Sequence, residues 1–213
     1  MTGLRGALLV ALLAPVGALS CTPVPLLQGA ETLSPGSEDR GVGVFTVVPL
    51  REGASIVPVQ NAEVEEVHQK PLPSLVGWYR RGMGVGEVQA AFQVPAFTMA
   101  VGYKVAFLGG SRSDTVSLAV SADMSWSPML GAYGTTGSLH ATFRPDRTYA
   151  IELLGRFGTF PGLWKLPALM VGGGVAIGER LPWRIQGGAL IDPGTGGTPG
   201  AWLGIGRGMS SGP

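Results

Sequence analysis

The sequence predicts an all-β protein, an antiparallel up-and-down β-barrel of about ten strands, within a range of roughly eight to ten. Three observations carry this prediction. Apolar residues alternate with small or polar residues over long runs. The runs recur at the spacing of hairpins, and no helical stretch is long enough for a β–α–β crossover. A sheet of this size exposes two edges unless it closes, so closure into a barrel is expected.

The clearest alternation lies in two arms, residues 97–107 and 115–126, which predict a hairpin of two long strands. The apolar residues of each arm share one face, and mainly Gly, Ala, Ser and Thr share the other. A slip of one residue would move every apolar side chain to the wrong face, so the pattern fixes the register. Lys104 and Asp123 are the charged residues of the second face, and we expect them to pair across the hairpin.

Three strands are expected before the hairpin. Residues 41–50 have one face made of Val42, Val44, Thr46, Val48 and Leu50. Residues 51–73 show no strand period and are expected to form a long loop. Residues 74–81 and 85–94 follow, and Glu87 lies on the polar face of the second of these strands.

Five strands are expected after the hairpin. They cover residues 137–143, 147–157, 168–178, 183–191 and 200–209. In the first two, alternate apolar residues oppose a polar set that contains His140, Glu152 and Arg156. The third sets apolar residues against small residues alone, and the fourth has Arg184 on its polar face.

The two faces of these strands indicate which side meets the interior. A soluble barrel would turn its apolar face inward and cover its outside with Lys, Glu and Asp. The second face is instead small, with few charges. We therefore expect the apolar face to meet lipid and the second face to line a narrow lumen, as in a barrel of outer-membrane type. The expected lumenal polar network, nearly balanced in charge, is Glu87, Lys104, Asp123, His140, Arg144, Glu152, Arg156 and Arg184.

Composition agrees with this interpretation. Charged residues make up 14% of the 213 residues, against roughly 25% in an ordinary soluble protein. The mean hydropathy is +0.29. The formal net charge of +1 supplies no basic field, so nucleic acid is excluded as an expected partner.

Aromatic residues and connection lengths bear on the same question. Aromatic residues lie near strand ends on the apolar face, where membrane interfaces favour them: Phe97, Phe107, Trp126, Phe143, Tyr149, Phe157 and Trp183. The core of a soluble sandwich is the alternative interpretation of these rings. We also expect short periplasmic turns and longer outer loops, with the outer loops at residues 51–73, 127–136, 158–167 and 192–199.

The amino terminus resembles an export signal. Arg5 is followed by an apolar stretch over residues 7–16 that is too short to read as a spanning helix. Small residues then lead up to Cys21, the only cysteine, so an internal disulfide is excluded. We expect a signal peptide over residues 1–20 and a proline- and glycine-punctuated tether over residues 21–40.

The stretch Ala18-Leu19-Ser20-Cys21 resembles the bacterial lipobox, in which the cysteine is acylated. With the alternating strands and the segment from Gly77-Trp78-Tyr79-Arg80-Arg81-Gly82 to Glu87, it resembles small outer-membrane β-barrel proteins of Gram-negative bacteria, some of them lipidated.

That resemblance implies a lipid-anchored barrel over residues 41–209, a tail at 210–213, and both termini in the periplasm. The chain ends without the aromatic residue that many such barrels carry. Ordinary cleavage that leaves Cys21 as a free thiol is the alternative to lipidation.

For function, we expect a structural or narrow-pore role without catalysis, with outer-membrane lipid and a small solute as partners. One alternative is a lipoprotein with a soluble barrel that binds a hydrophobic ligand. A second is a lipid-acyl hydrolase that uses Ser138, His140 and Glu152, although a lumenal hydrogen-bond network explains these three residues better. No cofactor is expected, and no His or Cys cluster has the spacing of metal ligands.

Overall fold

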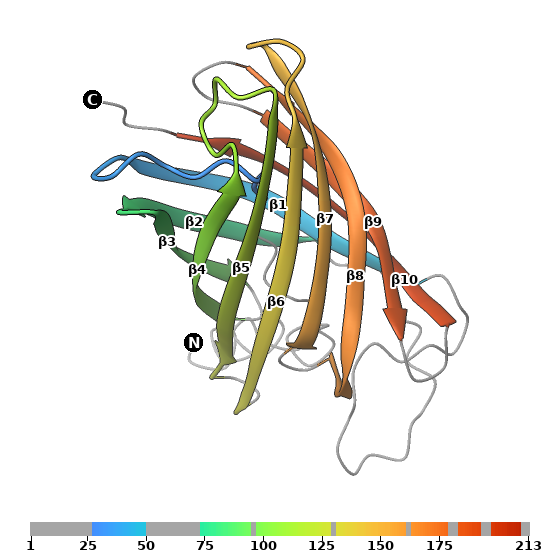
Figure 1. Ribbon diagram of the computed structural model, residues 1–213. Coiled ribbons are helices and arrows are strands. Elements are labelled where there is room, and N and C mark those ends of the chain that lie inside the picture. The colour runs from blue at the N-terminus through green and yellow to red at the C-terminus, as the bar shows by residue number, and fades with distance from the viewer. Residues whose placement is uncertain are drawn as a thin grey trace, which may run out of the picture.

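The fold is a closed barrel of ten antiparallel strands, in which every strand pairs with its neighbours in sequence and the last pairs with the first (Figure 1). This confirms the predicted fold class. The computed structural model describes residues 27–49, 73–94, 97–128, 131–160, 163–178, 183–192 and 197–209. Within these residues there is no helix long and apolar enough to cross a membrane.

The strands are β1 (Glu38–Pro49), β2 (Ser74–Met83), β3 (Gly86–Val94), β4 (Thr98–Leu108), β5 (Val116–Ser127), β6 (Ala132–Phe143), β7 (Tyr149–Phe160), β8 (Leu163–Ile177), β9 (Trp183–Asp192) and β10 (Gly197–Gly208). We call the end of the barrel where β1 begins the first rim, and the end where β1 finishes the second rim. The predicted hairpin corresponds to β4 and β5, and Gly109 and Gly110 follow β4 with positive φ.

The expected difference in connection length between the two rims is wrong for the loops after β5, β7 and β9. β6 begins at Ala132 rather than at residue 137, and β8 begins at Leu163 rather than at residue 168. Pairing continues there because the β5–β6 ladder extends to Ser127 opposite Ala132. The added residues, Ala-Tyr-Gly-Thr-Thr in β6 and Leu-Trp-Lys-Leu-Pro in β8, show no strict apolar alternation, so the sequence pattern did not reveal them. The loop predicted at 51–73 lies outside the described residues.

The wall of the barrel is apolar outside and polar inside. On β5 burial alternates residue by residue along the strand. Its exposed side chains include Val116, Val120, Met124 and Trp126. Its buried side chains include Ser117, Ser121, Asp123 and Ser125. The seven aromatic residues placed on the apolar face, from Phe97 to Trp183, are all exposed on the outer surface.

An apolar cluster also lies inside the barrel, which the sequence pattern did not predict. Its largest members are Phe45, Trp78, Met170, Leu190 and Trp202. The rings of Phe45 and Trp202 stack with centroids 5.9 Å apart. Glycines make room for these side chains, because a Cβ at Gly41 would overlap the Trp78 ring and one at Gly172 would meet Trp202.

Replacing Gly41 with valine tests this packing. We expect Gly41→Val to lower the free energy of unfolding by about 1–3 kcal/mol, because the added side chain must displace the buried Trp78 ring. The measurement is urea unfolding followed by tryptophan fluorescence. Gly155→Ala is the matched control, since a Cβ there meets nothing within 4 Å. Equal midpoints for both variants would contradict the packing described.

Candidate functional site

The candidate site is the lumen of the barrel, which the chain itself occupies. Residues 27–37, called the plug below, precede β1, and Leu27, Gln28, Ala30 and Glu31 are buried inside the barrel. The structure therefore differs from the expected free tether over residues 21–40. The described part of that stretch packs in the lumen, and its last three residues belong to β1.

The backbone of the plug is held by the wall. The Ala30 amide donates to Thr142 Oγ1 at 2.7 Å, and the Leu33 amide donates to Glu87 Oε2 at 2.9 Å. Lys104 Nζ donates to the carbonyl oxygens of Gly29 and Glu31, at 3.0 and 2.8 Å. Buried backbone groups need hydrogen-bond partners, and these wall side chains supply them to the plug, which does not pair as a strand.

Glycines in the wall shape a space for the plug. A Cβ built at Gly204 or at Gly206 would lie 2.8 Å from a methyl carbon of Leu27, and one at Gly43 would lie 3.1 Å away. The fit also works in the other direction. A Cβ at Gly29 of the plug would lie 2.6 Å from both Glu152 Oε1 and Thr142 Oγ1. Plug and wall are therefore complementary in shape as well as in hydrogen bonding.

The structure places all eight residues of the expected polar network in the interior. Each of them is buried: Glu87, Lys104, Asp123, His140, Arg144, Glu152, Arg156 and Arg184. Seven of them belong to three groups of ion pairs, and His140 contacts Ser121 instead.

The first group is built around Glu87. Its Oε1 accepts from Lys104 Nζ at 2.9 Å and from Arg80 Nη1 at 3.2 Å. Arg80 also donates through Nε to Asp39 Oδ2 at 3.0 Å. Arg80 and Asp39 lie outside the polar network expected from the sequence. Alternation with Trp78 and Gly82 was the available signal for Arg80, whereas Asp39 fell within the expected tether.

The second group is built around Asp123. It accepts from Arg156 Nη2 at 3.3 Å and from Gln89 Nε2 at 2.6 Å. The expected pairing of Asp123 with Lys104 is wrong. The β4–β5 register sets Lys104 opposite Ser121 and Asp123 opposite Gly102. Lys104 instead pairs with Glu87, which lies directly opposite it on β3, and Asp123 pairs with Arg156 on β7.

The third group joins the wall to the plug. Arg144 donates through both Nε and Nη2 to Glu31 Oε1, with Nε at 3.0 Å. Arg184 Nη2 lies 3.9 Å from Glu31 Oε2, and its Nε donates to Glu152 Oε1 at 3.1 Å. Gln186 Nε2 donates to the other Glu152 oxygen at 2.6 Å.

Charge inside the barrel balances only when the plug is counted. The buried cations among the described residues are Arg80, Lys104, Arg144, Arg156 and Arg184. The buried anions are Asp39, Glu87, Asp123 and Glu152 from the wall and Glu31 from the plug. Burial by itself would raise the pKa of Glu31, but the charges of Arg184 and Arg144 and the Arg144 hydrogen bond hold that pKa below its ordinary value.

Ser138, His140 and Glu152 are not joined by the hydrogen bonds that a catalytic triad needs. His140 Nε2 lies 3.1 Å from Ser121 Oγ on β5, and Glu152 is engaged by Arg184 and Gln186. Among the described residues no group of His, Cys, Asp and Glu side chains has the arrangement of a metal site. Cys21, the expected lipidation site, the signal peptide over 1–20 and the tail at 210–213 lie outside the described residues.

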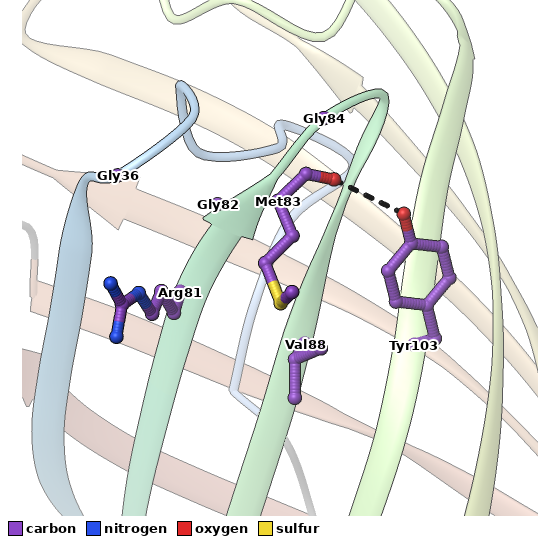
Figure 2. Close-up of a pocket in the computed structure, with 7 residues that line it drawn as sticks. All are labelled: Gly36, Arg81, Gly82, Met83, Gly84, Val88 and Tyr103. Carbon is purple, nitrogen blue, oxygen red and sulfur yellow. Dashed lines mark hydrogen bonds between the residues drawn. The ribbon is translucent and has the colours of Figure 1, made fainter.

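Apart from the lumen, a hollow opens on the outer surface at the first rim (Figure 2). Met83, Val88 and Tyr103 line it, and Tyr103 Oη donates to the Met83 carbonyl oxygen at 3.2 Å. Arg81, which also lines it, is exposed. The hollow holds none of the buried charges, so the lumen remains the stronger candidate.

Comparison with known proteins assigns the chain to no family. No protein-family model matches it, and no curated protein matches its sequence.

Proposed function

We propose that this protein is a lipid-anchored outer-membrane barrel, closed by its own plug, with a structural or narrow-pore role and no catalytic one. The observation that carries the proposal is the inverted polarity of the wall. Val101, Leu139 and Leu153 are 59%, 55% and 60% exposed on the outside, whereas ten charged side chains of the described residues are buried inside. Water-soluble monomers rarely expose continuous apolar surface on this scale, and a bilayer would cover it.

The exposed aromatic residues support the same proposal. Toward the second rim lie Phe92, Phe97, Trp126, Tyr133 and Phe157, and toward the first rim lie Phe107, Phe143, Tyr149 and Trp183. The Trp126 and Tyr133 rings stack with centroids 6.3 Å apart. Two belts of this kind are typical of a barrel whose ends lie at the two membrane interfaces.

The distance between the belts suits a bilayer. Tyr133 and Phe143 lie ten residues apart on β6. At about 3.3 Å per residue this is roughly 33 Å along the strand, or roughly 25 Å along the barrel axis at a tilt of about 40°. The apolar band of outer-membrane barrels is about 25 Å tall.

The ends of the wall fit the proposed topology and anchor. Gly41 pairs with Gly208, so the start of β1 and the end of β10 lie at the same rim. With ten strands, both ends of the wall would face the periplasm. Acylation of Cys21, proposed from the lipobox-like stretch, would add a second hold on outer-membrane lipid.

The two alternatives have less support. A soluble barrel that carries a hydrophobic ligand needs an apolar cavity, but charged side chains line much of the described lumen and the plug occupies it. A lipid-acyl hydrolase needs a nucleophile and a base that its substrate can reach, but the serine beside His140, Ser121, is buried inside the lumen, away from the surface where lipid would lie.

A charge at the middle of the outer surface tests membrane insertion. Leu139 lies between Tyr133 and Phe143 on β6, and we expect Leu139→Arg to cost about 2–4 kcal/mol of folding free energy in lipid vesicles, because arginine would lie near the bilayer midplane. The measurement is urea titration in vesicles. Met83→Arg, an exposed position at the first rim, is the control and should cost about 0–1 kcal/mol. Full folding of the wild type and Leu139→Arg in buffer without lipid or detergent would contradict the proposal.

Closure by the plug has its own test, through pH. The Glu31 pKa is lowered in the folded protein, so its ion pairs stabilise the fold above the unfolded value of 4.5 and are lost as pH falls through the lowered pKa. We expect Glu31→Gln to unfold at lower urea than the wild type at pH 7, and the difference to disappear in acid. A difference of the same size at all pH values would show that Glu31 does not act through its charge.

A further inference from the structure

The contact between Glu31 and the wall has the geometry of a bound ligand. One carboxylate oxygen accepts two hydrogen bonds from the Arg144 guanidinium, and the other faces the Arg184 guanidinium at 3.9 Å. The two arginines come from β9 and from the residue that follows β6, which are not neighbouring strands. The carboxylate therefore bridges the lumen, and it belongs to a segment that is not part of the wall.

On the wall side of this site, the hydrogen-bond donors of Arg184 are not all used. Arg184 is 1% exposed, yet its Nη1 has no hydrogen-bond partner among the described residues. A buried guanidinium normally uses its donors, because an unpaired buried donor costs about 1–3 kcal/mol. Glu31 reaches Arg184 only at the limit of an ion pair, whereas a free ligand is not restrained by a backbone and can approach both guanidinium groups.

The charge of the interior points in the same direction. Without Glu31, the buried charges of the wall are five cations and four anions among the described residues. Glu152 is already shared between Arg184 and Gln186, so it does not supply the missing charge for Arg144. The wall by itself thus lacks one anion at this place, and the plug provides it.

We propose that Arg144 and Arg184 form a binding site for a small free carboxylate anion, and that Glu31 occupies this site as a tethered competitor. A planar carboxylate matches the forked donors of arginine and has two oxygens for two guanidinium groups. Binding of the free anion releases the Glu31 end of the plug. This proposal does not depend on membrane insertion, because the site lies wholly inside the barrel.

Removal of the tethered carboxylate tests the site directly. Glu31→Ala leaves a space between the two arginines, and we expect its urea midpoint to fall below that of the wild type. Sodium acetate should then restore most of the lost midpoint, whereas sodium chloride or phosphate at the same ionic strength should not. The double variant Glu31→Ala/Arg144→Gln should lose the response to acetate.

Glu38→Ala is the matched control, since Glu38 also pairs with two arginines but does so at the exposed rim. Its midpoint should not respond to acetate. An acetate response of Glu31→Ala no larger than the chloride response overturns the proposal, and a larger response to phosphate overturns the assignment to carboxylates.

The isosteric variant keeps the proposal testable if Glu31→Ala does not fold. In Glu31→Gln the tethered group is neutral, so acetate should displace it and speed hydrogen exchange of the Ala30 and Leu33 amides, which the wall holds in the wild type. Exchange rates that do not change with acetate at constant ionic strength would overturn the proposal.

Discussion

Charges enclosed in a barrel must find their partners inside it, and the rest of this structure follows from that constraint. A buried ion without a counterion is among the most costly features that a fold can carry. Arg80, Lys104 and Arg156 meet it through carboxylates of the wall. Among the carboxylates that the structure describes, none from the wall lies within ion-pair distance of Arg144, which pairs with the plug. The plug is therefore part of the electrostatic structure of the barrel rather than an appendage to it.

Shape and charge hold the plug at different points. Leu27 fits against Gly43, Gly204 and Gly206, where any larger residue would collide with it, and burial of a leucine contributes about 1.5–3 kcal/mol. Glu31, farther along the plug, is held by the arginines of the wall, Arg144 and Arg184. Between these points Lys104 binds two backbone carbonyl oxygens of the plug and also pairs with Glu87.

The fold could be predicted from the sequence because the alternation that defines β4 and β5 also separates two environments. The same logic placed Lys104, Glu152 and Arg184 on the inner face before any partner was known. The prediction from alternation failed where the structure depends on contacts between residues far apart in the sequence. The plug has no period, and its contacts join residues as far apart as Gln28 and Gln186, which are 158 positions apart. Some partners could not be predicted either, because an inward charge can reach a strand that is not adjacent to its own, as Asp123 on β5 does with Arg156 on β7.

The plug is held separately by the packing of Leu27 and by the ion pairs of Glu31, and this limits how far a ligand in the lumen could release it. An anion that replaces Glu31 compensates Arg144 and Arg184 but leaves Leu27 in its glycine-lined space and Lys104 on the plug backbone. Such an anion would loosen one end of the segment without expelling it, since the apolar contact does not depend on charge. Full opening would require that both holds fail together. The closed lumen is thus the state that the described contacts favour, and exchange of one carboxylate for another is the smallest change that the interior permits.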